Sequence, residues 1–221
     1  MGVRVSKDDI IRAFLDEAFM RSAGETSLKD IADKIGIKKA SLYNHFESRE
    51  DIVKQTFDSC AEYIGSITFT PKDIDSVTKK YPAPVVFKGI VNRYFKMHEK
   101  SPLFQIYTFV ASQKYFSKEA AQITARQDAK ILADTQSVLR SLVSFGKLQL
   151  SDDAVLHASQ WFCSGMTNML ENYLLDRKQL VASSPASGEG ELFSLPAEGK
   201  GLDKVDAFID AFIGIIQQLP G

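Results

Sequence analysis

Cysteine is scarce in this 221-residue chain, and the two that occur exclude a fold held together by disulfides. Cys60 and Cys163 lie far apart in the sequence and form no CxxC pair. A chain of this length buries about 70% of the surface of its unfolded state, so its core needs no disulfide or structural metal. We therefore expect a protein of a reducing compartment, the cytoplasm.

Long hydrophobic runs and an excess of one charge are also missing. The chain has 27 basic and 28 acidic residues, a net charge of −1, so nothing attracts it as a whole to nucleic acid or to a membrane. The longest apolar stretch, 207–216, contains Asp210 and is far shorter than the ~20 residues of a membrane-spanning helix. We expect no membrane partner, and any nucleic-acid site must be a local basic patch.

The sequence motifs of common catalytic sites are absent. The three histidines, His45, His98 and His157, are scattered and lack the HxxxH or HExxH spacing of a zinc site. The chain has no GxSxG nucleophile motif and no glycine-rich phosphate loop. We therefore expect no enzyme activity, no catalytic residue, no metal and no cofactor.

What the chain does contain is helical periodicity along most of its length. Ile10, Phe14 and Ala18 form one face of a first helix, and no stretch has the alternation of a strand ladder. Similar patterns predict helices over 28–34, 39–46, 85–98, 102–115, 118–145, 152–180 and 203–219. Three prolines weaken the pattern over 68–84, and glycine, serine and proline over 183–201 indicate a loop.

Residues 27–46 have the pattern of two short helices joined by a turn at Gly36. Ser27 and Asp30 have the spacing of a capping box, and apolar residues such as Ile31 and Leu42 recur where they can form a shared core. The outer face of the second helix is polar. Four basic residues and one acidic residue give 34–49 a net charge of +3. This pattern indicates a helix-turn-helix, whose second helix enters a DNA major groove about 12 Å wide.

The predicted fold is all-α, with a helix-turn-helix DNA-binding domain over 1–66 and a larger helical domain over 67–221. Ten residues are candidates for contact with DNA: Thr26, Ser27, Lys38, Lys39, Ala40, Ser41, Tyr43, Asn44, His45 and Arg49. A helix N-terminus at Thr26–Ser27 can hold a phosphate, and Lys38 and Lys39 can reach phosphates or a guanine edge. Any helical hairpin with a solvated basic face shows a similar pattern, so the pattern alone does not decide.

The stretch TSLKDIADKIGIKKASLYNHFESREDIV resembles the DNA-binding domain of the tetracycline-repressor (TetR) family of bacterial transcription regulators. The matching features are the Thr-Ser opening, the Ile-Ala pair, Gly36, the Leu-Tyr-x-His-Phe run and Arg49, and the resemblance covers about residues 7–60. One departure is the link between Gly24 and Thr26, which consists of Glu25 alone, whereas the family usually has a longer link. The last helix, DKVDAFIDAFIGIIQQL, is similar to the family's dimerising helix.

The resemblance implies a homodimer that binds palindromic double-stranded operator DNA in the major groove and responds to a small-molecule effector. It also implies that the helical domain over 67–221 is the effector-binding and dimerisation domain. A repressor released by its effector is the expected function. The alternatives are an activator, or a helical small-molecule-binding or adaptor protein that has lost DNA binding.

Two further groups of residues are candidates in the C-terminal region. Aromatic residues gather between Phe87 and Phe116, which predicts an apolar or aromatic effector, although the same residues can simply fill a helical core. The candidate effector-binding residues are Phe104, Tyr107, Trp161, Asn168 and Asn172. The last two long helices have apolar bands broad enough for both a core and a second chain, or for the core of a monomer. The candidate dimer-interface residues are Phe162, Met166, Phe208, Phe212 and Ile216.

Overall fold

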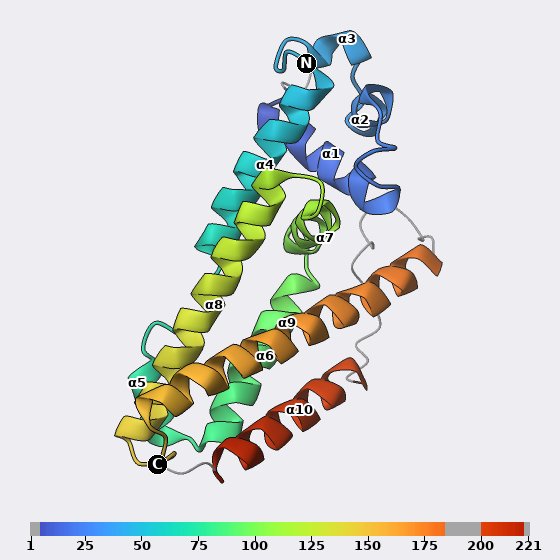
Figure 1. Cartoon of the computed structure of the whole chain (residues 1–221). Coiled ribbons are helices and arrows are strands. Elements are labelled where there is room, and N and C mark those ends of the chain that lie inside the picture. Colours follow the sequence, from blue (N-terminus) through green and yellow to red (C-terminus); the bar gives the residue numbers. More distant parts are fainter. Residues whose placement is uncertain (1–4, 184–199, 219–221) are drawn as a thin grey trace. The chain divides into compact units, whose positions relative to one another are not determined.

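The computed structural model describes residues 5–183 and 200–218, and every regular element in these ranges is a helix (Figure 1). The helices are α1 (Lys7–Met20), α2 (Leu28–Lys34), α3 (Lys39–Leu42), α4 (Arg49–Ser66), α5 (Ile74–Lys80), α6 (Ala83–His98), α7 (Leu103–Gln113), α8 (Lys118–Ser144), α9 (Asp152–Ser183) and α10 (Lys200–Ile216). The predicted all-α fold is therefore confirmed. The 183–201 segment that the sequence indicates as a loop lies mostly outside the described residues.

Serine side chains fix where three of the N-terminal helices begin. Ser6 and Ser27 each accept a hydrogen bond from the backbone N–H three residues on, and the aspartate there bonds back to the serine N–H. Ser48 accepts from the Asp51 N–H at the start of α4. These bonds satisfy backbone donors that have no partner within the helix, and the capping box predicted at Ser27 and Asp30 is confirmed.

The chain divides into two compact units that are not continuous in sequence. The first contains the chain up to Ile67 together with Ser101–Ala125, and the second contains Thr68–Lys100 and the described residues from Arg126 on. Helix α7 and the beginning of α8 thus pack with the N-terminal helices. A DNA-binding domain that ends at residue 66 remains a prediction, because a compact unit need not coincide with a functional domain.

Aromatic rings form the core of the first unit. The Phe109 ring of α7 packs against Phe14 of α1 and Phe57 of α4, with centroids 5.6 and 4.7 Å away. Phe104, also on α7, lies edge-on to Phe19 with centroids 4.9 Å apart. Helix α7 therefore holds α1 and α4, on which the short helices α2 and α3 depend.

Helices α6, α9 and α10 share the core of the second unit. Phe87 of α6 contacts Phe162 of α9 and Phe212 of α10, with centroids 4.9 and 5.7 Å away. On the polar edge of this packing, Lys88 Nζ lies 2.7 Å from the Asp210 carboxylate. None of the helices within the described ranges has both the length and the apolar character needed to cross a membrane.

Candidate nucleic-acid interface

Helices α2 and α3 pack through a small apolar base. Ile31 and Ala32 of α2, Leu42 of α3 and the following Phe46 are all buried. Gly36 adopts a φ of +69°, a left-handed conformation that favours glycine, and the next residue donates its N–H to the Ala32 carbonyl over 3.0 Å. The turn between the helices is therefore the one predicted.

The predicted helix over 39–46 is regular only as far as Leu42. Beyond it, the N–H of Asn44 donates to the Ser41 carbonyl and the N–H of His45 to the Leu42 carbonyl, three residues back in each case. The tighter turns keep the same face outward. Two of the candidate DNA-contacting side chains, Ser41 and His45, are partly exposed. Five more are exposed: Lys38, Lys39, Ala40, Tyr43 and Asn44. The structure thus brings these seven together on one surface.

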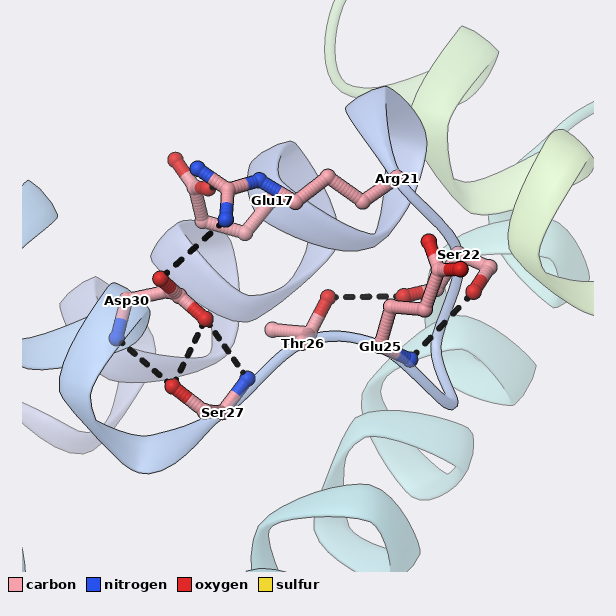
Figure 2. Close-up of polar contacts among 7 residues, drawn as sticks. All are labelled: Glu17, Arg21, Ser22, Glu25, Thr26, Ser27 and Asp30. Carbon is pink, nitrogen blue, oxygen red and sulfur yellow. Dashed lines mark hydrogen bonds and ion pairs between the residues drawn. The ribbon is translucent and has the colours of Figure 1, made fainter.

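Thr26 and Ser27 occupy a different environment (Figure 2). Thr26 is buried, and its hydroxyl donates to the Ser22 carbonyl over 2.8 Å. Ser27 donates both its hydroxyl and its backbone N–H to the same Asp30 oxygen, at 2.6 and 2.9 Å. The bond from the Ser27 hydroxyl is the main cause that lowers the pKa of Asp30. The donors expected to hold a phosphate are already used within the chain, and a carboxylate stands beside them.

A chain of polar contacts joins α1 to α2 despite the single-residue link at Glu25. Arg21 Nη1 lies 3.2 Å from the Asp30 carboxylate, and Arg21 Nε lies 3.6 Å from Glu17 (Figure 2). The Glu25 N–H donates to the Ser22 hydroxyl over 3.3 Å. The shorter link is therefore accommodated by side-chain bonds across the loop.

Arg49, the first residue of α4, points its guanidinium at the same loop. Its Nε donates to the Thr26 carbonyl over 3.0 Å, and its Nη2 donates to the Ala23 carbonyl. The side chain was expected to complete a phosphate clamp. In the structure, two of its nitrogen atoms donate to these backbone carbonyls.

The five candidate effector-binding residues belong to two different units. Phe104 and the half-buried Tyr107 belong to the first unit, where the Phe104 ring is fully enclosed by its own chain. In the second unit, Asn168 and Asn172 are exposed and bond to each other over 3.1 Å. Trp161 is 45% exposed and rests on Phe212. Within the second unit, the three candidate side chains are therefore on the surface.

The candidate dimer-interface residues mostly serve the core of the second unit. Phe162, Met166, Phe212 and Ile216 are buried by their own chain, so none of them has surface left for a second copy. Phe208 is half-buried over Gly165. The residues that α9 and α10 expose are their neighbours, among them Trp161, Ala207, Ala211 and Ile215. The sequence pattern does not separate the two sides of these helices, and the structure shows which side of each faces inward.

A polar cluster that the sequence did not indicate lies in the second unit. The Tyr173 hydroxyl donates to one Glu99 oxygen and Arg177 Nη2 lies beside the other, both at 2.6 Å. Burial is the main cause that raises the pKa of Tyr173. One buried atom of this cluster, Arg177 Nε, has no hydrogen-bond partner. Tyr173 and Arg177 are four residues apart on α9, but no local pattern points to Glu99.

Potential metal ligands do not gather anywhere in residues 5–183 and 200–218, where no group of three His, Cys, Asp or Glu side chains could hold an ion.

Comparison with known proteins links the N-terminal helices to one family. Residues 10–56 match the family model described as bacterial regulatory proteins, tetR family. A curated relative, the biofilm operon icaADBC HTH-type negative transcriptional regulator IcaR of Staphylococcus aureus, is 39% identical over 61 residues, which are 28% of this chain and 33% of IcaR. The chain thus matches about one third of the length of this relative.

Solved structures show that the likeness in fold extends beyond this segment. A protein from Mesorhizobium loti assigned to the TetR family has a TM-score of 0.57 at 16% identity, with 95% of both chains covered. A TetR transcriptional regulator from Legionella pneumophila has a TM-score of 0.55 at 18% identity, with 96% of this chain and 98% of that chain covered. At these identities the comparison establishes the fold.

Proposed function

Because the chain belongs to the TetR family of bacterial regulatory proteins, we propose that it is a transcription repressor that binds operator DNA through α2 and α3. The observation that carries this proposal is the exposed polar face of α3 above the buried base of Ile31, Ala32, Leu42 and Phe46. Repression rather than activation is supported by IcaR, which is a negative transcriptional regulator.

The side chains of this face suit the chemistry of a major groove. Lys38 and Lys39 carry positive charge at the start of α3 and are proposed to contact phosphates. Asn44 is proposed to contact a base edge, since an amide can make two hydrogen bonds to adenine. Tyr43, 54% exposed, is proposed to donate its hydroxyl to a phosphate, with Ala40 allowing close approach to the groove. Ser41 and His45 complete the contact surface.

We propose that the repressor acts as a homodimer formed by the exposed sides of α9 and α10. Ala207, Ala211 and Ile215 are exposed and follow one another at intervals of one helical turn, and small residues let a second helix approach closely. Trp161 of α9 adds a half-exposed ring. A two-fold axis would place two α3 helices about 34–36 Å apart, one turn of DNA.

We propose an effector site among the helices of the second unit. Its aromatic core, formed by residues such as Phe87, Phe95 and Phe162, favours an apolar or aromatic molecule. The partnerless atom Arg177 Nε offers a donor to orient it. Because Glu99 neutralises the Arg177 charge, a neutral molecule with a hydrogen-bond acceptor suits this site better than a strongly anionic one.

Selection of bound DNA from a genomic library, followed by gel shifts at several salt concentrations, tests the main proposal. Lys39→Ala is expected to weaken binding to all DNA and to reduce the salt slope by about 0.9. Asn44→Ala is expected to cost about 1–3 kcal/mol at particular base pairs only. Lys147→Ala, a matched loss of an exposed lysine outside α2 and α3, is the control. Wild-type affinity in both Lys39→Ala and Tyr43→Phe would refute the assignment.

Two further measurements test repression and dimerisation. In transcription with purified polymerase, addition of the protein is expected to lower the transcript from a promoter that carries the operator; a rise would indicate an activator.

Ile215→Glu is expected to halve the mass seen by light scattering and to abolish operator binding. The control is Tyr115→Glu, which also introduces a glutamate, at a position 83% exposed in the first unit. This control is expected to leave both the mass and operator binding unchanged. Wild type that is monomeric at micromolar concentration yet binds a palindrome tightly would refute the dimer.

Thermal shifts against a panel of metabolites test the effector proposal. Neutral apolar or aromatic compounds are expected to raise the melting temperature of wild type, and more weakly that of Arg177→Met. Arg140→Met, which removes an exposed arginine, is the control. If only phosphorylated or polycarboxylate compounds stabilise the protein, the proposed ligand class is wrong.

A further inference from the structure

Two backbone carbonyls in the loop between α1 and α2 receive their hydrogen bonds from one distant side chain. Ala23 and Thr26 are 9% and 1% exposed, so their backbone groups have little access to water. Arg49 Nε donates to the Thr26 carbonyl over 3.0 Å, and Arg49 Nη2 donates to the Ala23 carbonyl. A buried carbonyl left without a donor is costly. Arg49 therefore supplies what this loop cannot supply from its own residues.

The loop needs such a donor because it is short and irregular. Ser22 has a φ of 138°, an unusual conformation for a residue with a side chain, and its carbonyl already accepts from both the N–H and the hydroxyl of Thr26. Only Gly24 and Glu25 separate Ala23 from Thr26. With so few residues to turn the chain, the direction in which α2 leaves the loop depends on bonds from outside it.

Those bonds fix α2 from two sides. Toward α1, Arg21 Nη1 lies 3.2 Å from the carboxylate of Asp30 in the first turn of α2. Toward α4, the contacts are the two donated by Arg49. Helix α2 in turn carries α3, because Ile31 and Ala32 pack with Leu42 in one buried base. A change in the direction of α2 thus moves the exposed polar face of α3.

We infer that Arg49 is a positioning residue, which clasps the α1–α2 loop to the start of α4 and thereby orients α2 and α3 toward the operator. This inference rests on the proposed DNA-binding function. It assigns the phosphate contacts to lysines such as Lys38 and Lys39, since two guanidinium nitrogens of Arg49 face the protein backbone. Orientation governs base contacts far more than the general attraction between charges.

Arg49→Lys and Arg49→Met are the test, measured on the operator and on an unrelated duplex over a range of salt concentrations. A lysine keeps the charge but cannot reproduce the guanidinium fork. We expect both variants to lose about tenfold or more in operator affinity and to lose less than about threefold on the unrelated duplex, with the salt slope of wild type. Lys39→Met is the comparison for a true phosphate contact, with a slope lower by about 0.9.

Other patterns would overturn the inference. Wild-type behaviour of Arg49→Lys with a lower salt slope in Arg49→Met would show a phosphate contact. An equal loss on both duplexes in both variants would show a general loss of folded protein, and so would overturn a role in orientation. A wild-type chain that binds no DNA would refute the proposed function instead.

Hydrogen exchange tests, without DNA, whether Arg49 binds the carbonyls of the α1–α2 loop. We expect the Nε–H of Arg49 to exchange at least about tenfold more slowly than that of Arg140, whose side chain is 56% exposed. We also expect the backbone amides of 26–31 to exchange faster in Arg49→Lys than in wild type. Equal rates for the two arginines, or unchanged rates in the variant, would overturn the clasp.

Discussion

Gly165 of α9 lies beneath the ring of Phe208 of α10, and the replacement of this glycine by alanine gives a prediction with a defined sign. A Cβ atom at Gly165 would lie 2.6 Å from Phe208 Cζ and 2.8 Å from Cε2. Carbon atoms pack at about 3.5–4.0 Å, so the ring or the helix must move by about 1 Å. Such overpacking costs about 1–3 kcal/mol, whereas alanine in place of glycine within a helix gains about 1 kcal/mol.

We therefore expect Gly165→Ala to destabilise the wild-type protein by up to about 2 kcal/mol. In the Phe208→Ala background, where the ring is absent, the same replacement should stabilise the protein by about 1 kcal/mol. Urea unfolding at one fixed chain concentration measures all four combinations. Gly89→Ala, on α6 with nothing within 4 Å of its Cβ position, is the control and should stabilise both backgrounds equally. If Gly165→Ala stabilises the protein as much as Gly89→Ala while Phe208 is present, the packing argument is refuted.

Three other substitutions test the stability of the two units. Burial lowers the pKa of His98 from 6.5 to about 4. As the pH falls from 6.5 to 4, the unfolded chain therefore binds a proton that the folded chain does not, and the free energy of unfolding decreases. Over this pH range, wild type should lose about 3 kcal/mol more of its free energy of unfolding than His98→Phe, as measured by urea unfolding. No such difference would contradict the burial of the imidazole. Ser27→Ala removes the cap of α2 and should cost about 1 kcal/mol, measured by thermal unfolding, and an unchanged melting temperature would contradict the capping role. Leu42→Ala, at a position 1% exposed, should cost about 2–5 kcal/mol and abolish gel shifts, whereas retained stability would show that the α2–α3 base is not a packed core.

The sequence predicted those features whose cause lies within a few residues. The cap of α2 follows from a serine and an aspartate three positions apart, and the turn before α3 follows from Gly36. The exposed face of α3 was also predictable, because the spacing of Leu42 and Phe46 fixes which side of the helix is buried. Each of these signals is local, and no distant contact competes with it.

The sequence is least informative where distant contacts decide the surroundings of a side chain. The side chains of Thr26 and Arg49 suit phosphate, but the loop of residues 21–27 uses both to satisfy its own backbone. On α10 the apolar band is wide enough for two faces, so periodicity could not tell the inward Phe212 from the outward Ile215. That distinction needs the positions of α6 and α9, which no spacing within α10 contains.

The placement of Trp161 has a consequence for spectroscopy. It is the only tryptophan in the chain, so the fluorescence excited at its absorption edge comes from one site without labelling. One side of its ring lies against Phe212, at a centroid distance of 5.4 Å, while 45% of the residue is exposed in the single chain. An indole that straddles apolar packing and water emits at a wavelength that reports how much solvent surrounds it. The protein thus contains its own fluorescent probe. In a dilution series, the emission wavelength of Trp161 would report whether a second chain covers the outer face of α9. This measurement works at nanomolar concentrations, below the range of light scattering.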